Sequence, residues 1–259
     1  MYPVSKKQLP TETIELEQYE LRFAQTPEEL DSIYRLRYSV FNLELSEGLD
    51  ASHKHGRDID EYDPFCHHLY VTDVRSGTCV GTYRMLTQEM ASAGIGFYSS
   101  GEFDLTTIPD NIIAKSVEIG RACIDAEHRT ITVLHLLWKG LGIYMSHNDL
   151  QYLFGCCSLT SQNTLEGTAV YHYLQMKGHV LDSFSIQPHP ANSCGDHSAE
   201  RISTITARIP RLMRAYLAQG AKICGPPAID RAFKTIDYLA FFDIENVSYG
   251  AISYYRLRG

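Results

Sequence analysis

Apolar and polar residues recur with different periods along this chain, and each period predicts one element of secondary structure. Residues 19–24 alternate apolar with polar side chains, as in a half-buried strand. Thr26 then begins a helix, with Pro27 at its first position and two acidic residues in its first turn. Apolar residues spaced three and four apart extend this helix to about Glu44: Leu30, Ile33, Tyr34, Leu36, Val40 and Phe41.

The middle of the chain predicts a hairpin and then a long buried strand. Residues 45–66 are rich in Asp, Glu and His, and we interpret them as a loop that passes over a site. Two apolar runs, 68–73 and 78–86, are separated by an Arg-Ser-Gly turn and therefore form a hairpin. Residues 116–124 are a further apolar run with the length of a buried strand.

Helices and strands alternate in the second half of the chain. A helix over 129–146 has one apolar side, and a buried strand over 152–157 follows it. Gly178 and Gly220 stand where a left-handed residue commonly ends a helix. The remaining predicted elements are a helix over 166–177, a polar loop over 183–200, a helix over 210–219, a strand near 221–225, a short helix near 227–235 and an apolar segment over 238–244.

This order of elements predicts an α/β (α+β) fold with a mixed central sheet and helices on both faces. The strand at 116–124, the helix that begins near Arg129 and the strand after it form a βαβ unit. The N-terminus of such a helix commonly binds a ligand phosphate. The length fits a single domain over residues 1–259, with a core over about 18–180 and a C-terminal extension over about 181–259.

Two charged residues interrupt the apolar run at 116–124. Glu118 and Arg121 are costly in a buried strand unless each has a partner or a chemical task. Side chains three residues apart point to opposite faces of a regular strand, so each needs a partner of its own. Asp60, Asp63 and Arg84 are the upstream candidates. This pattern predicts an active site built on strands.

The composition is that of a soluble globular protein, with 44% apolar and 21% charged residues. No apolar run approaches the roughly 20 residues that span a membrane, and residues 1–17 lack the apolar core of a signal peptide, so we expect a cytoplasmic protein. The seven cysteines have no CxxC spacing and are interpreted as free thiols, Cys156 and Cys157 as packing residues. We expect no bound metal, because the histidines at 53, 55, 67 and 68 lack a metal-site spacing.

Charge is distributed unevenly along the chain. The net charge of −8 argues against general affinity for nucleic acid. Residues 201–259, however, hold nine basic and four acidic side chains, a local net charge of +5. This basic region suggests an acidic partner such as an acidic carrier protein, a phosphorylated cofactor or an anionic lipid. The alternative is that these residues only solvate helix faces.

Four short motifs in order carry a family resemblance. The chain resembles the acyl-homoserine-lactone (autoinducer) synthases and, more closely, the hemolysin-like N-acyltransferases of the ornithine-lipid type. Both groups are relatives of the GNAT acyltransferases. The similarity runs from about residue 30 to 160 and, more loosely, to 240. The motifs are Arg37-Tyr-Ser-Val-Phe41, Asp60-Glu-Tyr-Asp63, Gly81-Thr-Tyr-Arg84 and Glu118-Ile-Gly-Arg121.

Further similarity to the ornithine-lipid group lies in Gly96–Leu105, Leu137–Leu141 and Leu153–Cys156, but two features depart from related families. The autoinducer synthases have a Trp in the loop after the first helix, whereas the only Trp here is Trp138. The GNAT pyrophosphate loop is also absent, because the segment from Arg129 keeps the arginine without the glycines. Glycines there let the backbone approach a pyrophosphate. Their absence favours acyl carrier protein over coenzyme A as the donor.

The resemblance implies a GNAT-like fold, with a parallel, splayed strand pair at the cofactor site. It also implies an N-acyltransferase that moves a long-chain acyl group, 3-hydroxy acyl groups included, from an acyl carrier protein thioester to the α-amine of an amino acid such as ornithine or glycine. No cofactor is held permanently, since the acyl-phosphopantetheine thioester is a co-substrate. The roles implied are catalytic for Glu118 (general base), Arg121 and Arg84; substrate-binding for Arg37, Asp60, Asp63 and Phe103; and cofactor-binding for Ala122, Cys123, Ile124, Arg129 and Thr130.

Several alternatives stay open at this point. Three other functions remain alternatives: an acyl-homoserine-lactone synthase, a coenzyme A-dependent GNAT enzyme and a non-catalytic module that binds an acylated carrier. The alternative role of Glu118 is that of a structural ion-pair partner of Arg84. The alternative role of Asp63 is to anchor the loop rather than to bind the substrate. If the product is a lipid, the basic C-terminal region and the apolar segment 238–244 are candidates for peripheral contact with the inner membrane face.

Overall fold

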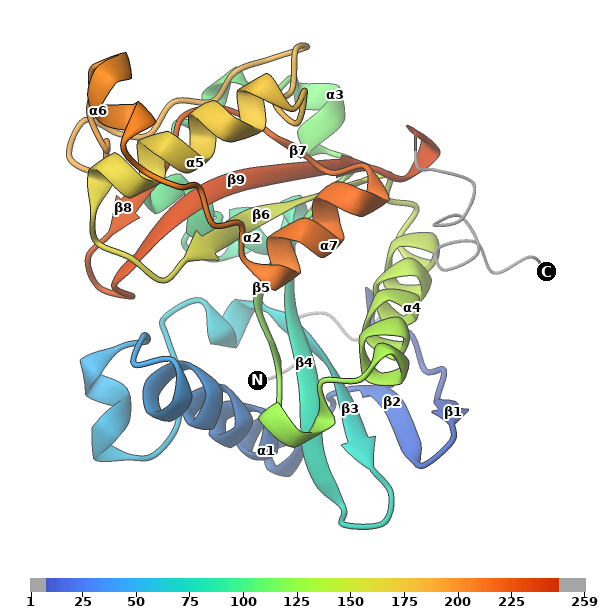
Figure 1. Cartoon of the computed structure of the whole chain (residues 1–259). Coiled ribbons are helices and arrows are strands. Elements are labelled where there is room, and N and C mark those ends of the chain that lie inside the picture. Colours follow the sequence, from blue (N-terminus) through green and yellow to red (C-terminus); the bar gives the residue numbers. More distant parts are fainter. Residues whose placement is uncertain (1–7, 247–259) are drawn as a thin grey trace.

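The computed structural model describes residues 8–246, and most of its elements belong to or cover one nine-stranded sheet (Figure 1). The strand order is β1-β2-β3-β4-β5-β6-β9-β7, and β8 pairs with β9. Neighbouring strands are antiparallel except β5 and β6. The strands are β1 (Ile14–Leu16), β2 (Tyr19–Phe23), β3 (His67–Asp73), β4 (Thr78–Thr87), β5 (Ser116–Ile124), β6 (Tyr152–Leu159), β7 (Lys222–Ile223), β8 (Ala228–Asp230) and β9 (Thr235–Asp243).

Helices cover both faces of this sheet. The helix α1 packs on β4 and β5, whereas α4 packs on β2 and β3 through the opposite face, and α5 and α7 lie in front of β6 and β9 (Figure 1). The mixed, mostly antiparallel sheet with flanking helices is therefore confirmed. The helices are α1 (Pro27–Tyr38), α2 (Gln88–Ala93), α3 (Asp110–Ile113), α4 (Ile131–His147), α5 (Thr164–Met176), α6 (Ala199–Ser203) and α7 (Arg211–Gln219).

The first helix shows why local sequence signals succeed here. The Thr26 hydroxyl accepts a hydrogen bond from the Glu29 N–H, and the Glu29 carboxylate accepts one from the Thr26 N–H, so the predicted start is a capping box. The apolar pattern continues past α1 into a π-helical segment, Ser39–Glu44, which accounts for the predicted end near Glu44. The loop that follows lies over the sheet face that α1 covers.

The parallel pair β5 and β6 separates soon after it begins. The two strands are in register only from Ser116 to Glu118, after which β5 pairs with β4 alone and β6 pairs with β9. At the point of divergence, a side chain at Gly155 would place its Cβ 2.1 Å from the carbonyl oxygen of Ile119, so the position requires glycine. The splayed pair confirms that part of the prediction and opens a space between the strands.

Three predictions for the second half of the chain need correction. Residues 227–235 are not a helix, because β8 pairs with β9 and a turn follows β8. The apolar segment 238–244 lies largely within β9, where Tyr238 and Leu239 are buried. It is therefore unavailable for membrane contact. The predicted extension after residue 180 also supplies three strands to the same sheet, so it is integral to the fold.

Candidate active site

A buried network of charges joins α1, the loop before β3, and strands β4 and β5. Arg37 is fully buried, and its guanidinium group donates to Asp58 at 2.7 Å and to both Asp63 oxygens at 2.7 and 3.0 Å. Arg84 donates to both Asp60 oxygens at 2.6 and 2.7 Å and to Asp63 at 3.2 Å. Charge-assisted pairs of this kind are the strong hydrogen bonds of a protein interior.

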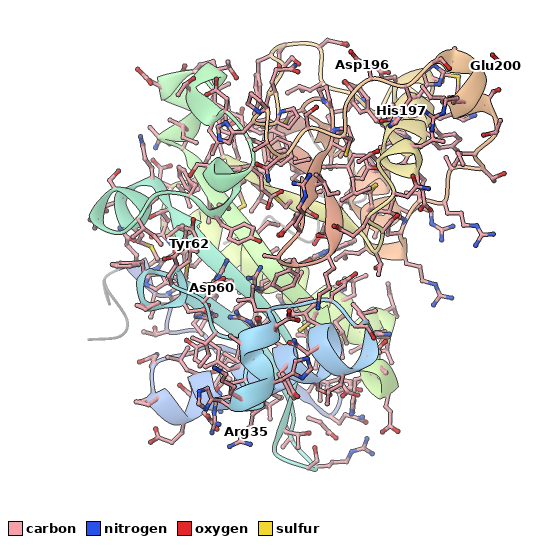
Figure 2. The ribbon with its side chains drawn as sticks, turned by 90° about the vertical axis from the view of Figure 1, so that its left-hand side faces the viewer. Arg35, Asp60, Tyr62, Asp196, His197 and Glu200 are labelled. Atoms are coloured by element: carbon pink, nitrogen blue, oxygen red, sulfur yellow. The ribbon has the colours of Figure 1, made fainter. Side chains whose placement is uncertain are left out.

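Arg121 completes this network, which pairs three arginines with three aspartates. It donates to Asp60 at 2.8 Å and lies 3.3 Å from Asp58. Burial alone would raise the pKa of the Asp63 carboxyl, but Arg37 and Arg84 outweigh burial and hold that pKa well below its usual range. Asp63 therefore stays ionised at neutral pH, and the network fixes the loop to the sheet. Figure 2 shows Asp60 and Tyr62 beside the central strands, whereas Arg35 lies on the outer side of α1.

The prediction that Glu118 and Arg121 point to opposite faces of β5 is wrong. The register of β4 and β5 shifts between Thr82 and Arg84, which marks a β-bulge, and Arg121 has a left-handed φ of 49°. This bulge turns Arg121 to the Glu118 side, where its guanidinium carbon lies 5.0 Å from the centre of the Tyr98 ring. A left-handed arginine stores backbone strain, and such strain is commonly found at functional sites.

Glu118 is held by a turn rather than by an arginine. Its Oε1 accepts hydrogen bonds from the backbone N–H of Ser99 at 2.7 Å and from the Ser99 hydroxyl, and its Oε2 accepts one from the Tyr98 N–H at 2.7 Å. Arg84 pairs with the aspartates instead. Burial raises the pKa of Glu118 against the lowering effect of the Ser99 and Tyr98 donors. Oε2 keeps a lone pair that can accept a proton.

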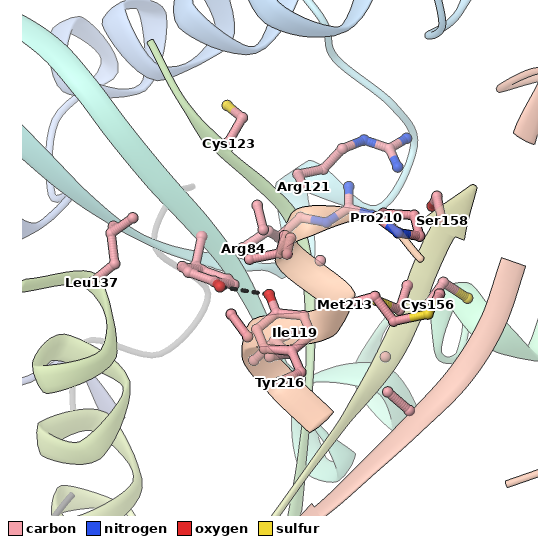
Figure 3. A pocket seen from close by; sticks show the side chains of 18 of the residues that line it. Arg84, Ile119, Arg121, Cys123, Leu137, Cys156, Ser158, Pro210, Met213 and Tyr216 are labelled. Carbon is pink, nitrogen blue, oxygen red and sulfur yellow. Dashed lines mark hydrogen bonds between the residues drawn. The ribbon is translucent and has the colours of Figure 1, made fainter. Parts of the chain in front are cut away.

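A cavity of about 580 Å³ lies where β5 and β6 separate. Polar side chains gather at the strands, where Arg84, Glu118 and Arg121 line it. Figure 3 shows Leu137 on one side of the view, Cys156 and Ser158 on the other side, and Tyr216 between them. The Tyr83 and Tyr216 hydroxyls are 2.5 Å apart, a hydrogen bond that ties α7 to β4. The apolar lining of the cavity comes mainly from α4, α7 and the strands: Leu134, Leu137, Trp138, Leu141, Leu212, Met213, Ala215, Phe154 and Phe242.

Comparison with known proteins places this geometry in a family. A family model described as an acetyltransferase (GNAT) domain matches residues 36–139. The L-ornithine N(alpha)-acyltransferase of Rhizobium meliloti (strain 1021) is 30% identical over 247 residues, which are 91% of this chain and 83% of the relative. That of Agrobacterium fabrum (strain C58 / ATCC 33970) is 31% identical over 249 residues, 91% of this chain and 84% of the relative. The chain belongs to the ornithine N-acyltransferase family.

A solved structure supports the fold of this N-acyltransferase. The crystal structure of TofI in a ternary complex with an inhibitor and MTA superimposes with a TM-score of 0.53 at 12% identity, covering 92% of this chain and 97% of that chain. Together with the family match, this confirms the expected GNAT-like fold and N-acyltransferase class. Within residues 8–246, no helix has the length and hydrophobicity needed to cross a membrane.

The residues expected to bind the donor line the cavity of the acyltransferase. Ala122, Cys123 and Ile124 follow the β5 bulge, on the edge that β6 has left. Thr130 caps α4 by accepting a hydrogen bond from the Val133 N–H. Arg129 also lines the cavity, but both of its terminal nitrogens donate to Glu44 at 2.6 Å, so a phosphate would compete with this carboxylate.

The residues expected to bind the acceptor are placed differently. Arg37, Asp60 and Asp63 belong to the buried network and do not line the cavity. Their hydrogen bonds hold the loop against α1 and β4. Phe103 is 1% exposed and packs in the core between the 97–108 segment and β9. Its contacts are those of a packing residue.

Sequence reasoning missed several groups at this site. Asp58 is fully buried between Arg37 and Arg121, but it lies among many other acidic residues in a polar stretch. Tyr98 reaches the site through a turn, and Asp237 reaches it through β9, more than a hundred residues from Glu118. An acidic residue inside the apolar run at 235–243 was the one signal for Asp237, and it is the same signal that identified Glu118.

Proposed function

We propose that this enzyme transfers a long-chain fatty acyl group from an acyl carrier protein thioester to the α-amine of an amino acid, with ornithine or glycine as acceptor. The observation that supports it most is the cavity at the splayed strands, which joins a charged end at Glu118 to an apolar end under α4 and α7. Each methylene buried there contributes about 0.8 kcal/mol, which favours a long acyl chain over acetyl. The names of the relatives support ornithine as acceptor.

In the proposed reaction, the neutral α-amine attacks the thioester carbonyl carbon. The N–C bond forms, the C–S bond breaks, and the carrier leaves as a thiol. The free α-ammonium first loses one proton to solvent. Attack then leaves a positively charged nitrogen in the tetrahedral intermediate, and Glu118 takes that N–H proton at Oε2, directly or through a water, and passes it to the sulfur as the C–S bond breaks. The raised pKa of Glu118 suits this role, because a base works best with a pKa close to the working pH. Backbone N–H groups of residues 121–124 stabilise the oxyanion.

Arg84 and Arg121 act beside this base. Both line the cavity, and both are fixed by the aspartates of the network. The positive charge of Arg84 stabilises the ionised form of Glu118, and Arg121 holds the bulged strand to Asp60. We propose Arg129 and Thr130, at the start of α4, as the contacts of the single phosphate of phosphopantetheine.

Exposed arginines support an acidic carrier as donor. Arg208, Arg211 and Arg214 lie on or just before α7, and Arg211 also lines the cavity. A carrier protein with an acidic surface would be attracted to them. The same three residues supply the proposed peripheral contact with an anionic membrane, and liposome binding that is unchanged after their neutralisation would refute that contact. Arg256 and Arg258 of the basic region lie outside the described residues.

A reconstituted reaction tests the donor and the acceptor together. Purified enzyme receives ornithine or glycine with the same acyl chain on either acyl carrier protein or coenzyme A. We expect N-acyl amino acid from the carrier, and Arg211→Glu should raise KM for the carrier more than KM for coenzyme A. Equal kcat/KM for the two donors would refute the carrier. Absence of product from every pair, while the acylated carrier still binds, would refute the proposed function.

A further inference from the structure

A second group of acidic side chains meets at the cavity, separate from the charge network. Glu102 follows the turn that holds Glu118, and Asp237 lies in β9. A carboxylate oxygen of each and the Cys156 sulfur all lie within 4.8 Å of one another. Asp237 and Cys156 line the same cavity as Glu118. The proposed reaction uses none of these three groups.

One oxygen of each carboxylate lacks a partner, whereas Asp237 also has side-chain hydrogen bonds with Ser158 and Thr235. Oε2 of Glu102 and Oδ1 of Asp237 are buried and accept no hydrogen bond from any residue in the described range 8–246. The residues are only 6% and 3% exposed. Asp230 lies nearby on β8 but is fully occupied, since it accepts hydrogen bonds from the Tyr98 hydroxyl and from two backbone N–H groups. Buried polar atoms without partners are rare, and each one requires an explanation.

The electrostatic cost of this arrangement is large. Burial raises the pKa of Glu102 to about 10, and the repulsion of Asp237 and Asp230 adds to the effect. Burial also raises the pKa of Asp237 to about 6. The arginines closest to the cavity end of β5 already pair with Asp58, Asp60 and Asp63. A cation placed between Glu102 and Asp237 would offset both the repulsion and the unmade hydrogen bonds.

We propose that Glu102 and Asp237 bind the side-chain ammonium group of the acceptor, which makes the acceptor a diamino acid rather than glycine. This inference rests on the proposed function. An ammonium group donates three hydrogen bonds and matches two facing carboxylates. A metal ion held by Glu102, Cys156 and Asp237 is the competing occupant, and zinc binding distinguishes it from the ammonium group. Because Asp237 and Glu118 line the same cavity, one acceptor would present its α-amine to Glu118 and its side-chain ammonium group to Asp237 and Glu102.

The test compares ornithine with norvaline, which has the same carbon chain without the side-chain ammonium. We expect the wild-type enzyme to prefer ornithine in kcat/KM by roughly a hundredfold or more, because norvaline leaves buried carboxylate oxygens without partners. This comparison needs no variant. In the Glu102→Gln and Asp237→Asn variants, the ratio of kcat/KM for ornithine to kcat/KM for norvaline should fall at least about tenfold. Asp73→Asn removes a buried carboxylate at the far end of β3 and should keep the wild-type ratio.

The outcomes separate the two proposals. If the wild-type enzyme acylates ornithine, norvaline and glycine with similar kcat/KM, the ammonium site is refuted and the proposed function stands. If it acylates none of them, the proposed function fails. A ratio that falls equally in Glu102→Gln and Asp73→Asn would also refute the site, as would stoichiometric zinc binding that Asp237→Asn abolishes.

Discussion

Replacement of Arg37 by methionine tests the role of the buried network. Methionine has a similar reach without the charge, and Arg37 makes three hydrogen bonds of 2.7–3.0 Å to Asp58 and Asp63. After the change, Asp58 keeps the ion pair with Arg121 at 3.3 Å, and Asp63 keeps Arg84 and His68, each at 3.2 Å, and the Asp60 N–H at 2.8 Å. Removal of one partner from a buried ion pair costs about 3–5 kcal/mol, because the remaining charges stay buried.

Urea unfolding measures this loss. For a chain of this size the unfolding free energy changes by up to about 3 kcal/mol per molar urea, so the midpoint should fall by about 1 M or more. Arg35→Met is the matched control, since Arg35 lies on the same helix and its pair with Asp31 is exposed. We expect that control to change the midpoint by about 0.1 M.

A double variant separates a broken network from lost packing. The double variant Arg37→Met with Asp63→Asn removes a charge from each side of the pair. Its loss of unfolding free energy should therefore be smaller than the sum of the losses in the two single variants. An Arg37→Met midpoint within about 0.2 M of the Arg35→Met midpoint would refute the account of the network. Full additivity in the double variant would show that Arg37 contributes packing alone.

Three further predictions follow from the site. Ser99→Ala removes a hydroxyl donor that lowers the pKa of Glu118, so the acid limb of the kcat/KM pH profile should move to higher pH; an unchanged limb would exclude Glu118 as the titrating base. Ala215→Phe fills the apolar part of the cavity and should shorten the preferred acyl chain, whereas Ala218→Phe on the exposed side of α7 should not, and product mass spectra decide. Burial raises the pKa of Glu102 to about 10, so between its unfolded pKa near 4.5 and pH 10 the folded state holds a proton that the unfolded state has lost, and stability should fall as pH rises. Glu102→Gln should flatten this dependence in urea unfolding at pH 5, 7 and 9, and parallel curves would contradict it.

The sequence was most informative where a charge interrupts an apolar run. Arg121 identified its partner Asp60, because a buried charge must be compensated, whereas Glu118 is compensated by the turn at Tyr98 and Ser99 and not by Arg84. The face of Arg121 was not predictable, since the bulge and the left-handed φ depend on pairing with β4.

Long-range pairing explains the other failures. Residues 227–235 have too short an apolar pattern to distinguish strand from helix, and pairing with β9 decides the outcome. Glu102 and Asp237 are 135 positions apart in the printed sequence, and only the folded sheet brings them together. Tertiary contacts of this kind leave no local pattern.

The most direct test of the proposed N-acyl transfer is mass spectrometry of lipid extracts from cells that overproduce the wild-type chain or its Glu118→Gln variant. The account predicts a new long-chain N-acyl amino acid in the wild-type extract and at least about a hundredfold less of it with the variant, at equal amounts of folded protein. The same new lipid at equal levels in both extracts would contradict Glu118 as the base. Its absence from both, with acceptor and acylated carrier abundant, would contradict the transfer itself.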